Sequence, residues 1–326
     1  MTIVITGGSG FIGTNLVEFL IKKNHKVINY DIVEPRNISH LKYWINLDIL
    51  DKQKLSFQLN LDNPNFIIHL AARTDLNEKI NISGYDVNIT GVQNLMDVSI
   101  TIKNLNRIIV ASSMLVCKTG YIPNTFDDYQ PNNLYGESKV LSEKIVKSFG
   151  NNWVIIRPTS IWGPWFREPY FNFFRLVIKG FYFNIPKTKA SIKTYGYVEN
   201  ACLQIYSIMI AESEMVVHKY FYLGDKMPIN ITDWADLIRK LLKKRKLLTL
   251  PLLFLKFGSY LGDFLHFFLN IKNFPLNSFR YSNMTTNNII EDVNRTNKLL
   301  NDDSLITHEF GVKITLDWIS KQAGKN

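Results

Sequence analysis

The sequence predicts an α/β protein: a doubly wound parallel sheet with a smaller C-terminal domain that interleaves with it. Over the first half of the chain, short β-branched runs alternate with helical patterns, which is typical of parallel α/β sheets. A glycine-rich loop joins the first run to the first helix, and after Arg157-Pro158 the pattern changes to aromatic residues and Gly/Pro turns. We therefore expect the sheet domain at residues 1–158, with return segments near 190–225, and mainly the smaller domain at 159–326.

Six segments are expected to be strands buried on both faces, because each is short and apolar. They are Ile3–Thr6, Lys26–Asp31, Trp44–Leu47, Asn65–Leu70, Arg107–Ala111 and Trp153–Ile156. Helices are expected between them, and the clearest are Gly10–Lys23, Asp86–Ile102 and Leu134–Phe149, with Gly150 as a helix stop.

Composition excludes several classes of protein. The chain has 326 residues, of which 46% are hydrophobic, so it can build a large core without disulfides. Its two cysteines, Cys117 and Cys202, are too few and too far apart for a disulfide framework or a metal-ligand pattern, so we expect a reducing compartment and no metal site. The first expected strand begins at Ile3, which leaves no room for a signal peptide and predicts a cytoplasmic protein.

The charge balance is basic, with 38 Lys and Arg residues against 28 Asp and Glu residues and a net charge of +10. Such a balance fits nucleic acid, an anionic membrane surface or a phosphorylated substrate. No nucleic-acid recognition motif is present, and the densest group of cations stands beside Leu and Phe residues. We therefore expect no nucleic acid as a partner.

The loop after the first strand has the spacing of a dinucleotide-binding turn. Gly7 permits a tight turn, Gly10 lets the backbone approach a pyrophosphate, and Gly13 allows the helix to pack closely on the strand. The helix start adds free N–H groups and the positive end of the helix dipole. The expected sheet is therefore of the Rossmann type, and the smaller domain would bind the substrate.

Asp31 ends the second expected strand, 18 residues after Gly13. A carboxylate at this place accepts hydrogen bonds from the adenosine ribose hydroxyls and repels a 2′-phosphate, so NAD is favoured over NADP. Two alternatives stay open: Asp31 as an ordinary surface acid, and NADP binding assisted by the nearby Arg36.

Tyr135 and Lys139 stand four residues apart near the start of an expected helix, and hence on one face of it. A free tyrosine has a pKa of about 10, and a neighbouring ammonium favours its phenolate, so the pair can form a general base. Ser112 and Ser113 follow the fifth strand at its carboxyl end, where a hydroxyl can hold a carbonyl or alkoxide oxygen beside the tyrosine. The alternative for the Tyr/Lys pair is a solvated helix face.

These motifs follow one another along the chain in a characteristic order. They are the glycine loop, Asp31, His69-Leu70-Ala71-Ala72, Asn88, Ser112-Ser113, Tyr135 with Lys139, and Arg157-Pro158. Together they resemble the extended short-chain dehydrogenase/reductases, the NAD-dependent epimerase/dehydratase group that acts on nucleotide sugars. The resemblance covers about residues 1–200 and continues more weakly to about residue 320.

The resemblance implies roles for the site residues. Tyr135 would be the acid/base, Lys139 its pKa partner and a ligand of the nicotinamide ribose, and Ser113 the hydrogen-bonding hydroxyl. The implied NAD-binding residues are Gly7, Gly10, Phe11, Ile12, Gly13, Asp31, Asp48, Ile49, Leu70, Ala71, Ala72, Ser112, Tyr135, Lys139 and Pro158. Asn88 would be a structural polar residue in the packing of helix on sheet. Family members are commonly homodimers through a helix bundle that would include residues 134–149.

Two departures from the family pattern concern the substrate side. The usual Val-Tyr-Gly after the serine is Val116-Cys117-Lys118 here, and Cys117 is expected to be a small buried apolar residue. Where galactose epimerases of the family carry an asparagine that binds the nucleotide diphosphate, this chain has Ser160. Substrate contacts are expected from Ser113, Ser160 and Arg280, whose guanidinium fork matches phosphate oxygens. The alternative for Arg280 is a surface cation.

Residues 239–246 contain six cations, and the Leu- and Phe-rich stretch Leu247–Leu269 follows them. Its longest uncharged run, Leu247–Leu255, is far shorter than the ~20 residues that span a bilayer. We interpret the stretch either as a helix pair that packs on the sheet or on a dimer partner, or as an interfacial element at an anionic membrane involving residues 239–269.

A narrower resemblance favours the membrane interpretation. The Arg-Pro-Thr-x-Ile-x-Gly turn at 157–163, Leu250-Pro251 and Asn277-Ser278-Phe279-Arg280 resemble polyprenyl-diphosphate-linked N-acetylhexosamine 4-epimerases. Those relatives work on a lipid-linked sugar at the cytoplasmic membrane face, which implies a location at the inner face of the membrane.

We expect an NAD-dependent 4-epimerase of a diphosphate-activated sugar, carried on a nucleotide or a polyprenyl chain, in surface polysaccharide biosynthesis of the bacterial type. The reaction would pass through a transient 4-keto sugar with NAD regenerated in each cycle. Met114 and Leu115 follow Ser113 in place of the acidic pair that 4,6-dehydratases of the family need. The alternatives are an NAD(P)H-dependent 4-keto-6-deoxy-sugar reductase and a non-catalytic NAD-binding protein.

Overall fold

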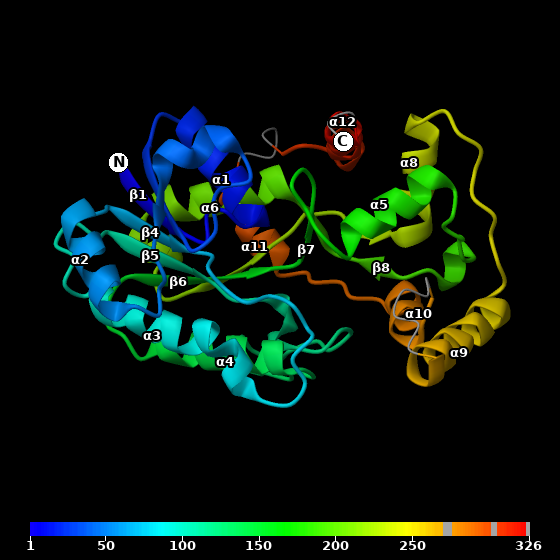
Figure 1. The fold of residues 1–326 in the computed structure, drawn as a ribbon, viewed down its shortest axis with the longest axis horizontal. Coiled ribbons are helices and arrows are strands. Elements are labelled where there is room, and N and C mark those ends of the chain that lie inside the picture. Colours follow the sequence, from blue (N-terminus) through cyan, green and yellow to red (C-terminus); the bar gives the residue numbers. More distant parts are fainter. Residues whose placement is uncertain (270–275, 301–304, 324–326) are drawn as a thin grey trace. The chain divides into compact units, whose positions relative to one another are not determined.

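The computed structural model describes residues 1–269, 276–300 and 305–323 (Figure 1). The chain divides into two compact units. The first unit comprises residues 1–166, 196–226 and 291–307, and the second comprises residues 167–195, 227–290 and 308–326. Each unit is therefore built from three separate stretches of the chain.

The first unit contains a seven-stranded sheet in which every neighbouring pair of strands is parallel, in the order β10-β6-β5-β4-β1-β2-β3. The strands are β1 (Thr2–Thr6), β2 (Lys26–Asp31), β3 (Trp44–Asn46), β4 (Phe66–His69), β5 (Arg107–Ala111), β6 (Trp153–Pro158) and β10 (Tyr220–Leu223). The chain order reverses between β1 and β4, which is where ligands bind at the carboxyl edge of such sheets. The predicted fold class, a doubly wound Rossmann-type sheet, is confirmed.

Helices cover both faces of this sheet (Figure 1). They are α1 (Phe11–Lys22), α2 (Lys52–Asp62), α3 (Asp86–Ser99), α4 (Leu134–Lys147), α6 (Val198–Ile210), α7 (Ser213–Val216) and α11 (Val293–Asn297), with 3-10 turns at Ile38–Tyr43, Ile82–Tyr85 and Met114–Val116. Successive side chains of β1 point to opposite faces. Ile3 and Ile5 belong to the core that includes α1 and α6, whereas Val4 belongs to the core that includes α2 and α3.

The strands and helices named in advance agree with the observed ones to within a few residues; α2 and β10 were not among those named. The expected helix at 86–102 ends at Ser99, and the expected helix at 134–149 ends at Lys147, before Gly150. Such differences of a few residues are usual at helix ends, which fray. A short separate sheet pairs β7 (Ser160–Trp162) with β9 (Tyr195–Tyr197).

The second unit is mainly helical. It contains α5 (Tyr170–Lys179), α8 (Ile231–Leu241), α9 (Leu252–Leu269), α10 (Ser278–Thr285) and α12 (His308–Ala323), a 3-10 turn at Lys187–Lys189, and the strand pair β8 (Ile192–Lys193) and β11 (Ile229–Asn230). Its core surrounds the fully buried Trp234, which contacts a group of aromatic rings. These rings belong to Tyr170, Phe173, Phe174, Tyr195 and His308. The aromatic residues that lack a clear period in the sequence thus form one core.

The described residues contain neither a membrane-spanning helix nor a cluster of metal ligands. None of their helices is long and apolar enough to cross a membrane. Among the same residues, His, Cys, Asp and Glu side chains nowhere form a group of three or more that could hold a metal ion. Cys117 and Cys202 are both buried and free.

Candidate active site

The glycine loop joins β1 to α1 at the carboxyl edge of the sheet. Gly7 has a φ of 76°, in the left-handed region, and a Cβ atom there would lie 2.5 Å from the backbone nitrogen of Ala71. A Cβ at Gly13 would lie 2.2 Å from the carbonyl oxygen of Gly7. A Cβ at Gly10 would meet only that same oxygen, at 3.1 Å, and no side chain in the described parts of the chain caps α1. The first turn of α1 thus presents its N–H groups to an anion.

Asp31 ends β2 beside this loop. Its carboxylate accepts hydrogen bonds from the backbone N–H groups of Ser9 and Val33, each at 3.0 Å. Burial raises the pKa of this carboxyl, and the N–H donors oppose the rise. The nearby Arg36 donates from its guanidinium to the carbonyl oxygen of Trp165 at 2.8 Å. Asp31 is therefore fixed against the glycine loop, while Arg36 is engaged with the main chain.

Asp48 and Ile49 follow β3 in a turn that a helix holds in place. The Asp48 side chain accepts a hydrogen bond from the Leu50 N–H at 2.9 Å. Ile49 is buried, and its side chain packs so closely on Gly91 of α3 that a Cβ there would meet it at 2.5 Å. Asn94 of α3 donates to the carbonyl oxygens of Ile49 and Leu50, both at 3.1 Å. Asn94 was not predicted as a site residue, although an asparagine on the buried face of a helix is a signal of such a role.

Leu70–Ala72 follows β4, and Asn88 of α3 fixes the residue that comes next. The Asn88 side chain accepts a hydrogen bond from the Arg73 N–H at 2.8 Å and donates to the Arg73 carbonyl oxygen at 3.0 Å. It also donates to the Ser138 hydroxyl at 3.0 Å, and that hydroxyl donates to the carbonyl oxygen of Tyr135 at 2.7 Å. Asn88, which is fully buried, thus connects the loop after β4 with the first turn of α4.

Ser113 and Tyr135 meet at the carboxyl end of β5, and both are buried. The Ser113 hydroxyl accepts a hydrogen bond from the Leu115 N–H at 3.1 Å, and it acts on the pKa of Tyr135. Asn133 caps α4 by accepting the Gly136 N–H at 2.8 Å, which sets the helix start one residue before Tyr135. Burial raises the pKa of Tyr135 to about 12, and the nearby Ser113 hydroxyl opposes that rise.

Lys139 lies one turn after Tyr135 and is also buried. Its amine donates to the carbonyl oxygen of Ala111 at 2.9 Å. Burial lowers the pKa of Lys139 to about 8, and the negative charge of Glu143 opposes the fall. We expected the neighbouring ammonium to lower the pKa of Tyr135. In this structure the net shift of the Tyr135 pKa is upward, because desolvation of the phenolate dominates.

A buried ion pair lies one turn further along α4. Arg157 of β6 donates to both carboxylate oxygens of Glu143, at 2.8 Å and 2.7 Å, and both side chains are almost fully buried. Arg157 also donates to the Tyr222 hydroxyl at 3.1 Å and to the carbonyl oxygen of Phe126 at 2.6 Å, while the Tyr129 hydroxyl donates to Glu143 at 2.8 Å. Arg157 was expected only as part of a turn motif, and its ion pair with Glu143 was not predicted.

A match to a family model shows the family to which this chain belongs. Residues 3–200, more than half of the chain, match the model described as "NAD dependent epimerase/dehydratase family". The chain belongs to the NAD-dependent epimerase/dehydratase family. NAD is thus the cofactor of the family to which the glycine loop, Asp31 and the Ser/Tyr/Lys group belong.

Individual relatives of this epimerase/dehydratase family member carry several activities. A UDP-glucose 4-epimerase from Vibrio cholerae is 32% identical over 191 residues, which are 55% of this chain and 57% of that relative. A 3-beta-hydroxysteroid dehydrogenase from Mycolicibacterium neoaurum is 27% identical over 257 residues, or 72% of this chain and 68% of that relative. The matches to the first curated relatives thus span little more than half of the relatives' length.

A solved structure extends the likeness of fold to the whole chain. The UDP-glucuronic acid 4-epimerase from Bacillus cereus, in complex with UDP-glucuronic acid and NAD, has a TM-score of 0.75 to this family member. The match covers 99% of this chain and 100% of that one, at 20% sequence identity. At that identity the comparison shows a shared fold.

Four more of the predicted cofactor contacts lie along the same edge of the sheet. Phe11 and Ile12 are the first two residues of α1, and Pro158 ends β6. The Ser112 hydroxyl is buried and finds no hydrogen-bond partner among the described residues, while its N–H donates to the Ile156 carbonyl oxygen at 2.7 Å. A buried hydroxyl of this kind is available to a ligand.

Two residues of the predicted substrate side are buried in the first unit. Ser160 begins β7. Cys117 packs in a small apolar cluster with Val116 and Val140, and its thiol donates to the carbonyl oxygen of Asp128 at 3.4 Å. Burial raises the pKa of the Cys117 thiol, so this residue is a packed side chain rather than a reactive one.

The second unit holds Arg280 and a buried lysine that the sequence analysis missed. Arg280 is exposed in the first turn of α10, where the Asn277 side chain accepts its N–H at 2.9 Å. Lys193 of β8 is buried, and its amine donates to the side-chain oxygen of Asn283 on α10 at 2.7 Å. Burial lowers the pKa of Lys193 to about 8. Asn283 stands three residues after Arg280, so Lys193 and Arg280 lie along one face of α10.

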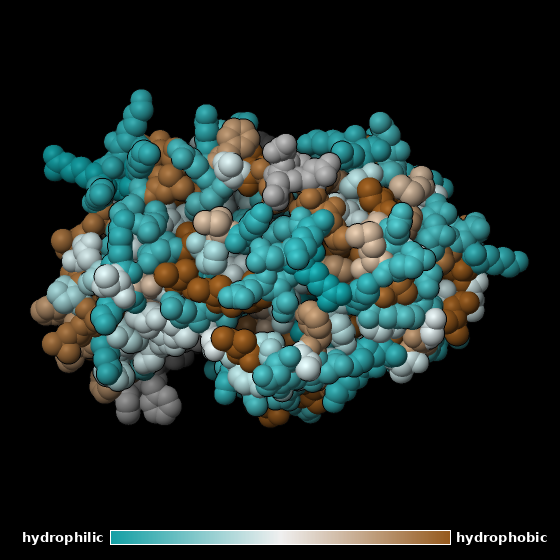
Figure 2. All heavy atoms as spheres, turned by 180° about the vertical axis from the view of Figure 1, so that it is seen from behind, coloured by the Kyte–Doolittle hydropathy of each residue, from teal (hydrophilic) through white to brown (hydrophobic). Residues whose placement is uncertain are grey.

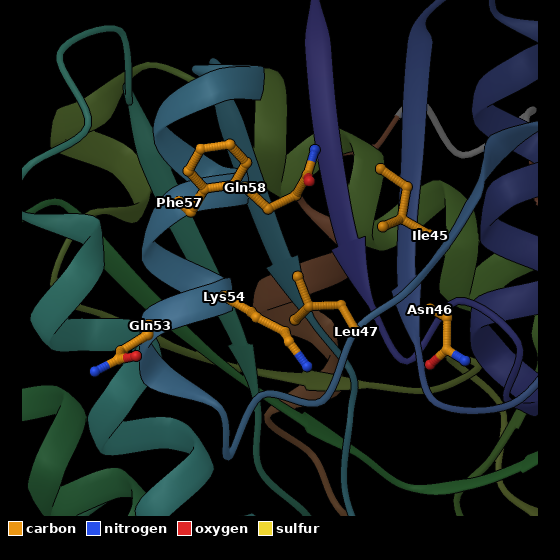
Figure 3. Close-up of a pocket in the computed structure, with 7 residues that line it drawn as sticks. All are labelled: Ile45, Asn46, Leu47, Gln53, Lys54, Phe57 and Gln58. Atoms are coloured by element: carbon orange, nitrogen blue, oxygen red, sulfur yellow. The ribbon is translucent and has the colours of Figure 1, made fainter.

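A pocket of about 320 Å³ opens on the first unit between β3 and α2 (Figure 3). Its lining consists of Ile45, Asn46, Leu47, Gln53, Lys54, Phe57 and Gln58. None of the predicted site residues belongs to it, although it adjoins the segment that leads to Asp48. The pocket is therefore separate from the Ser113–Tyr135 group at β5.

Proposed function

We propose that this chain is an NAD-dependent 4-epimerase of a diphosphate-activated sugar. The observation that carries the proposal is the burial of Ser113, Tyr135 and Lys139 at the carboxyl end of β5, where the Lys139 amine donates to the carbonyl oxygen of Ala111 at 2.9 Å. Relatives named as sugar 4-epimerases support it.

Three features of the first unit fit NAD. They are the space beside Gly10 that a side chain would otherwise fill, the start of α1 that no side chain of the described residues caps, and the Asp31 carboxylate beside them. We propose that the glycine loop holds the pyrophosphate, Asp31 the adenosine ribose, and Asp48-Ile49 the adenine. The other contacts would come from Phe11, Ile12, Leu70, Ala71, Ala72, Ser112, Tyr135, Lys139 and Pro158. When bound, NAD supplies a hydride acceptor that gives the hydride back in the same cycle, so no net redox change results.

The chain's own residues would handle the proton at the sugar's C4 position. Tyr135 would take the proton of the C4 hydroxyl and return it after the 4-keto sugar has presented its other face. The Ser113 hydroxyl would hold the C4 oxygen during both transfers. With a pKa of about 8, Lys139 stays largely protonated at neutral pH, so its positive charge can bind a ribose hydroxyl and stabilise the phenolate.

Lys193 and Arg280 are proposed to bind the substrate diphosphate, with Ser160 as a further substrate contact. A buried lysine that donates to an amide oxygen rather than to a carboxylate keeps its charge for an anion. Arg280 adds a guanidinium on the same face of α10, and its fork suits phosphate oxygens. Replacing either by alanine should raise the KM for the sugar substrate and leave NAD affinity unchanged.

We also propose the setting of the reaction. The sugar carrier would be a nucleotide or a polyprenyl chain, and the product would enter surface polysaccharide biosynthesis at the cytoplasmic face of the membrane. The enzyme would be a homodimer that uses α4, on which Leu141 is exposed.

A product assay by NMR tests the function. The protein is incubated separately with UDP-N-acetylglucosamine and with undecaprenyl-diphosphate N-acetylglucosamine, and conversion at C4 of one of them is expected without net NADH. Conversion of neither, together with NADH oxidation in the presence of a 4-keto-6-deoxy sugar, would instead identify a reductase. Bound NAD without turnover in either assay would identify a non-catalytic NAD-binding protein.

A further inference from the structure

The helix α9 exposes a continuous apolar face on the second unit. Among the side chains of α9 that the structure describes, six large apolar ones are exposed: Leu253 (77%), Phe254 (67%), Phe257 (72%), Tyr260 (58%), Leu261 (44%) and Phe264 (52%). At 100° per residue, these positions fall within an arc of about 120° on the helix surface. Hydrophobic side chains gather over α9 at the lower left of Figure 2. Monomeric proteins rarely expose a contiguous apolar patch of this kind unless it contacts something.

The opposite face of α9 packs on its own unit. Leu255, Ser259 and Gly262 are buried at a helical spacing of four and three residues. A Cβ at Gly258 would lie 3.2 Å from the Leu276 side chain, and the Asp263 carboxylate accepts hydrogen bonds from both the N–H and the hydroxyl of Ser278 at the start of α10. The helix therefore lies along the surface of the unit, with its apolar arc outward.

The segment that leads into α9 is strongly cationic and is held to the same unit. Arg239 and Lys244 donate to carbonyl oxygens at the end of α5, the latter to Ile178 at 2.9 Å. The other four cations of residues 239–246 are exposed, and this run contains no acidic residue. They are Lys240, Lys243, Arg245 and Lys246. Lys256 adds an exposed cation at the margin of the apolar arc.

We propose that α9 and residues 240–246 form a surface that binds anionic membranes. The Leu and Phe side chains would enter the boundary between head groups and acyl chains, and the cations would contact anionic head groups. A second copy of the chain is a poorer occupant of the surface, because a twofold contact presents the same patch, and the same cations, from both sides. The proposal stands independently of the proposed catalytic activity.

Vesicle flotation of the full chain tests this surface. The probes are vesicles of phosphatidylcholine alone and of equal parts phosphatidylcholine and phosphatidylglycerol. We expect the protein to float with the anionic vesicles, to float far less with the neutral ones, and to be released at ~1 M salt, where the Debye length is about 3 Å. Failure of the wild-type protein to float with anionic vesicles would overturn the proposal.

Two pairs of variants separate the apolar and cationic parts, and each has a matched control. Phe254→Ser/Phe257→Ser and Lys243→Glu/Lys246→Glu should each reduce binding, the second by roughly 30-fold or more, since each lysine near an anionic surface contributes about fivefold. The controls Phe57→Ser/Leu61→Ser on the exposed face of α2 and Lys79→Glu/Lys103→Glu should float like the wild type.

The folding and the oligomeric state of the same variants are measured as well. NAD binding and the melting temperature should match the wild type, which shows that the chain has folded. Flotation that is unchanged in both surface variants would refute the membrane surface. The same holds if Phe254→Ser/Phe257→Ser keeps flotation while light scattering shows a dimer turning into a monomer, since the face would then be a contact between copies.

Discussion

The side-chain amine of Lys139 donates a hydrogen bond to the carbonyl oxygen of Ala111 over 2.9 Å. This contact ties the first turns of α4 to the last residue of β5, and so it fixes Tyr135 against Ser113, which stands two residues beyond Ala111. The carbonyl dipole also compensates in part for removing an ammonium from water. This bond to the main chain thus helps to place Lys139 and Tyr135 beside Ser113.

Replacing Tyr135 by phenylalanine removes the hydroxyl and keeps the ring. We expect turnover to fall by about 10²–10⁴-fold, because the general acid/base is lost, while NAD affinity and melting temperature stay near the wild type. Tyr121→Phe removes the hydroxyl of a half-buried tyrosine that donates to the Asp128 carboxylate, and it serves as the control. Wild-type turnover in the Tyr135 variant, measured by the NMR assay, would exclude Tyr135 as the base.

Replacing Ser113 by alanine should move the pH dependence of the reaction. The Ser113 hydroxyl lowers the pKa of Tyr135 against the effect of burial, so its loss raises that pKa further. Less phenolate then exists at a given pH, and the rising limb of kcat/KM should shift to higher pH by about one unit, the amount that one hydrogen bond to a charged group contributes. Ser112→Ala, whose hydroxyl finds no partner in the described residues, should not shift the limb.

Replacing Glu143 by glutamine should destabilise the fold. Arg157 then keeps a buried charge that has lost its carboxylate, which typically costs about 3–5 kcal/mol of unfolding free energy. Urea denaturation followed by circular dichroism measures the loss. Glu137→Gln changes an exposed carboxylate on the same helix and should have little effect. An equal effect of both substitutions would contradict the importance of the buried pair.

Replacing Gly7 by alanine should disrupt the cofactor loop. The left-handed φ costs a residue with a side chain about 1–2 kcal/mol, and the new Cβ would collide with the main chain at Ala71. We expect a lower melting temperature and loss of NAD binding by fluorescence titration. In Gly150→Ala, by contrast, the new Cβ meets no atom within 4 Å, so both properties should be kept.

The sheet could be predicted from the sequence because its strands are apolar runs between helices of clear period. The helix α2 shows how a local pattern can indicate the wrong element. Leu55, Phe57, Leu59 and Leu61 alternate with polar residues, which imitates a strand, yet only Leu55 and Leu59 are buried in the helix that forms. The strand β10 lies in the expected return segment near 190–225, but it was not named as a strand although Tyr220–Leu223 is as short and apolar as the strands that were.

The candidate site was predictable wherever a motif is short and local, as with Gly7, Asp31 and the Tyr135/Lys139 spacing. Contacts between distant residues were not. Lys193 meets Asn283 across 90 positions, and neither residue is unusual where it stands. The raised pKa of Tyr135 could likewise not be predicted from the sequence, because it depends on burial, which only the folded chain defines.

The interleaving of the two units has a consequence for how the protein is made. A ribosome delivers residues 1–166 with β6 as an open sheet edge, because β10 is synthesised only after the first excursion into the second unit. The helix α6, whose Ile205 and Ile208 cover one face of the sheet, also emerges late. A gene fragment that stops at residue 166 would therefore yield an aggregation-prone product rather than a cofactor-binding module, and a protein fused to this one belongs at a terminus.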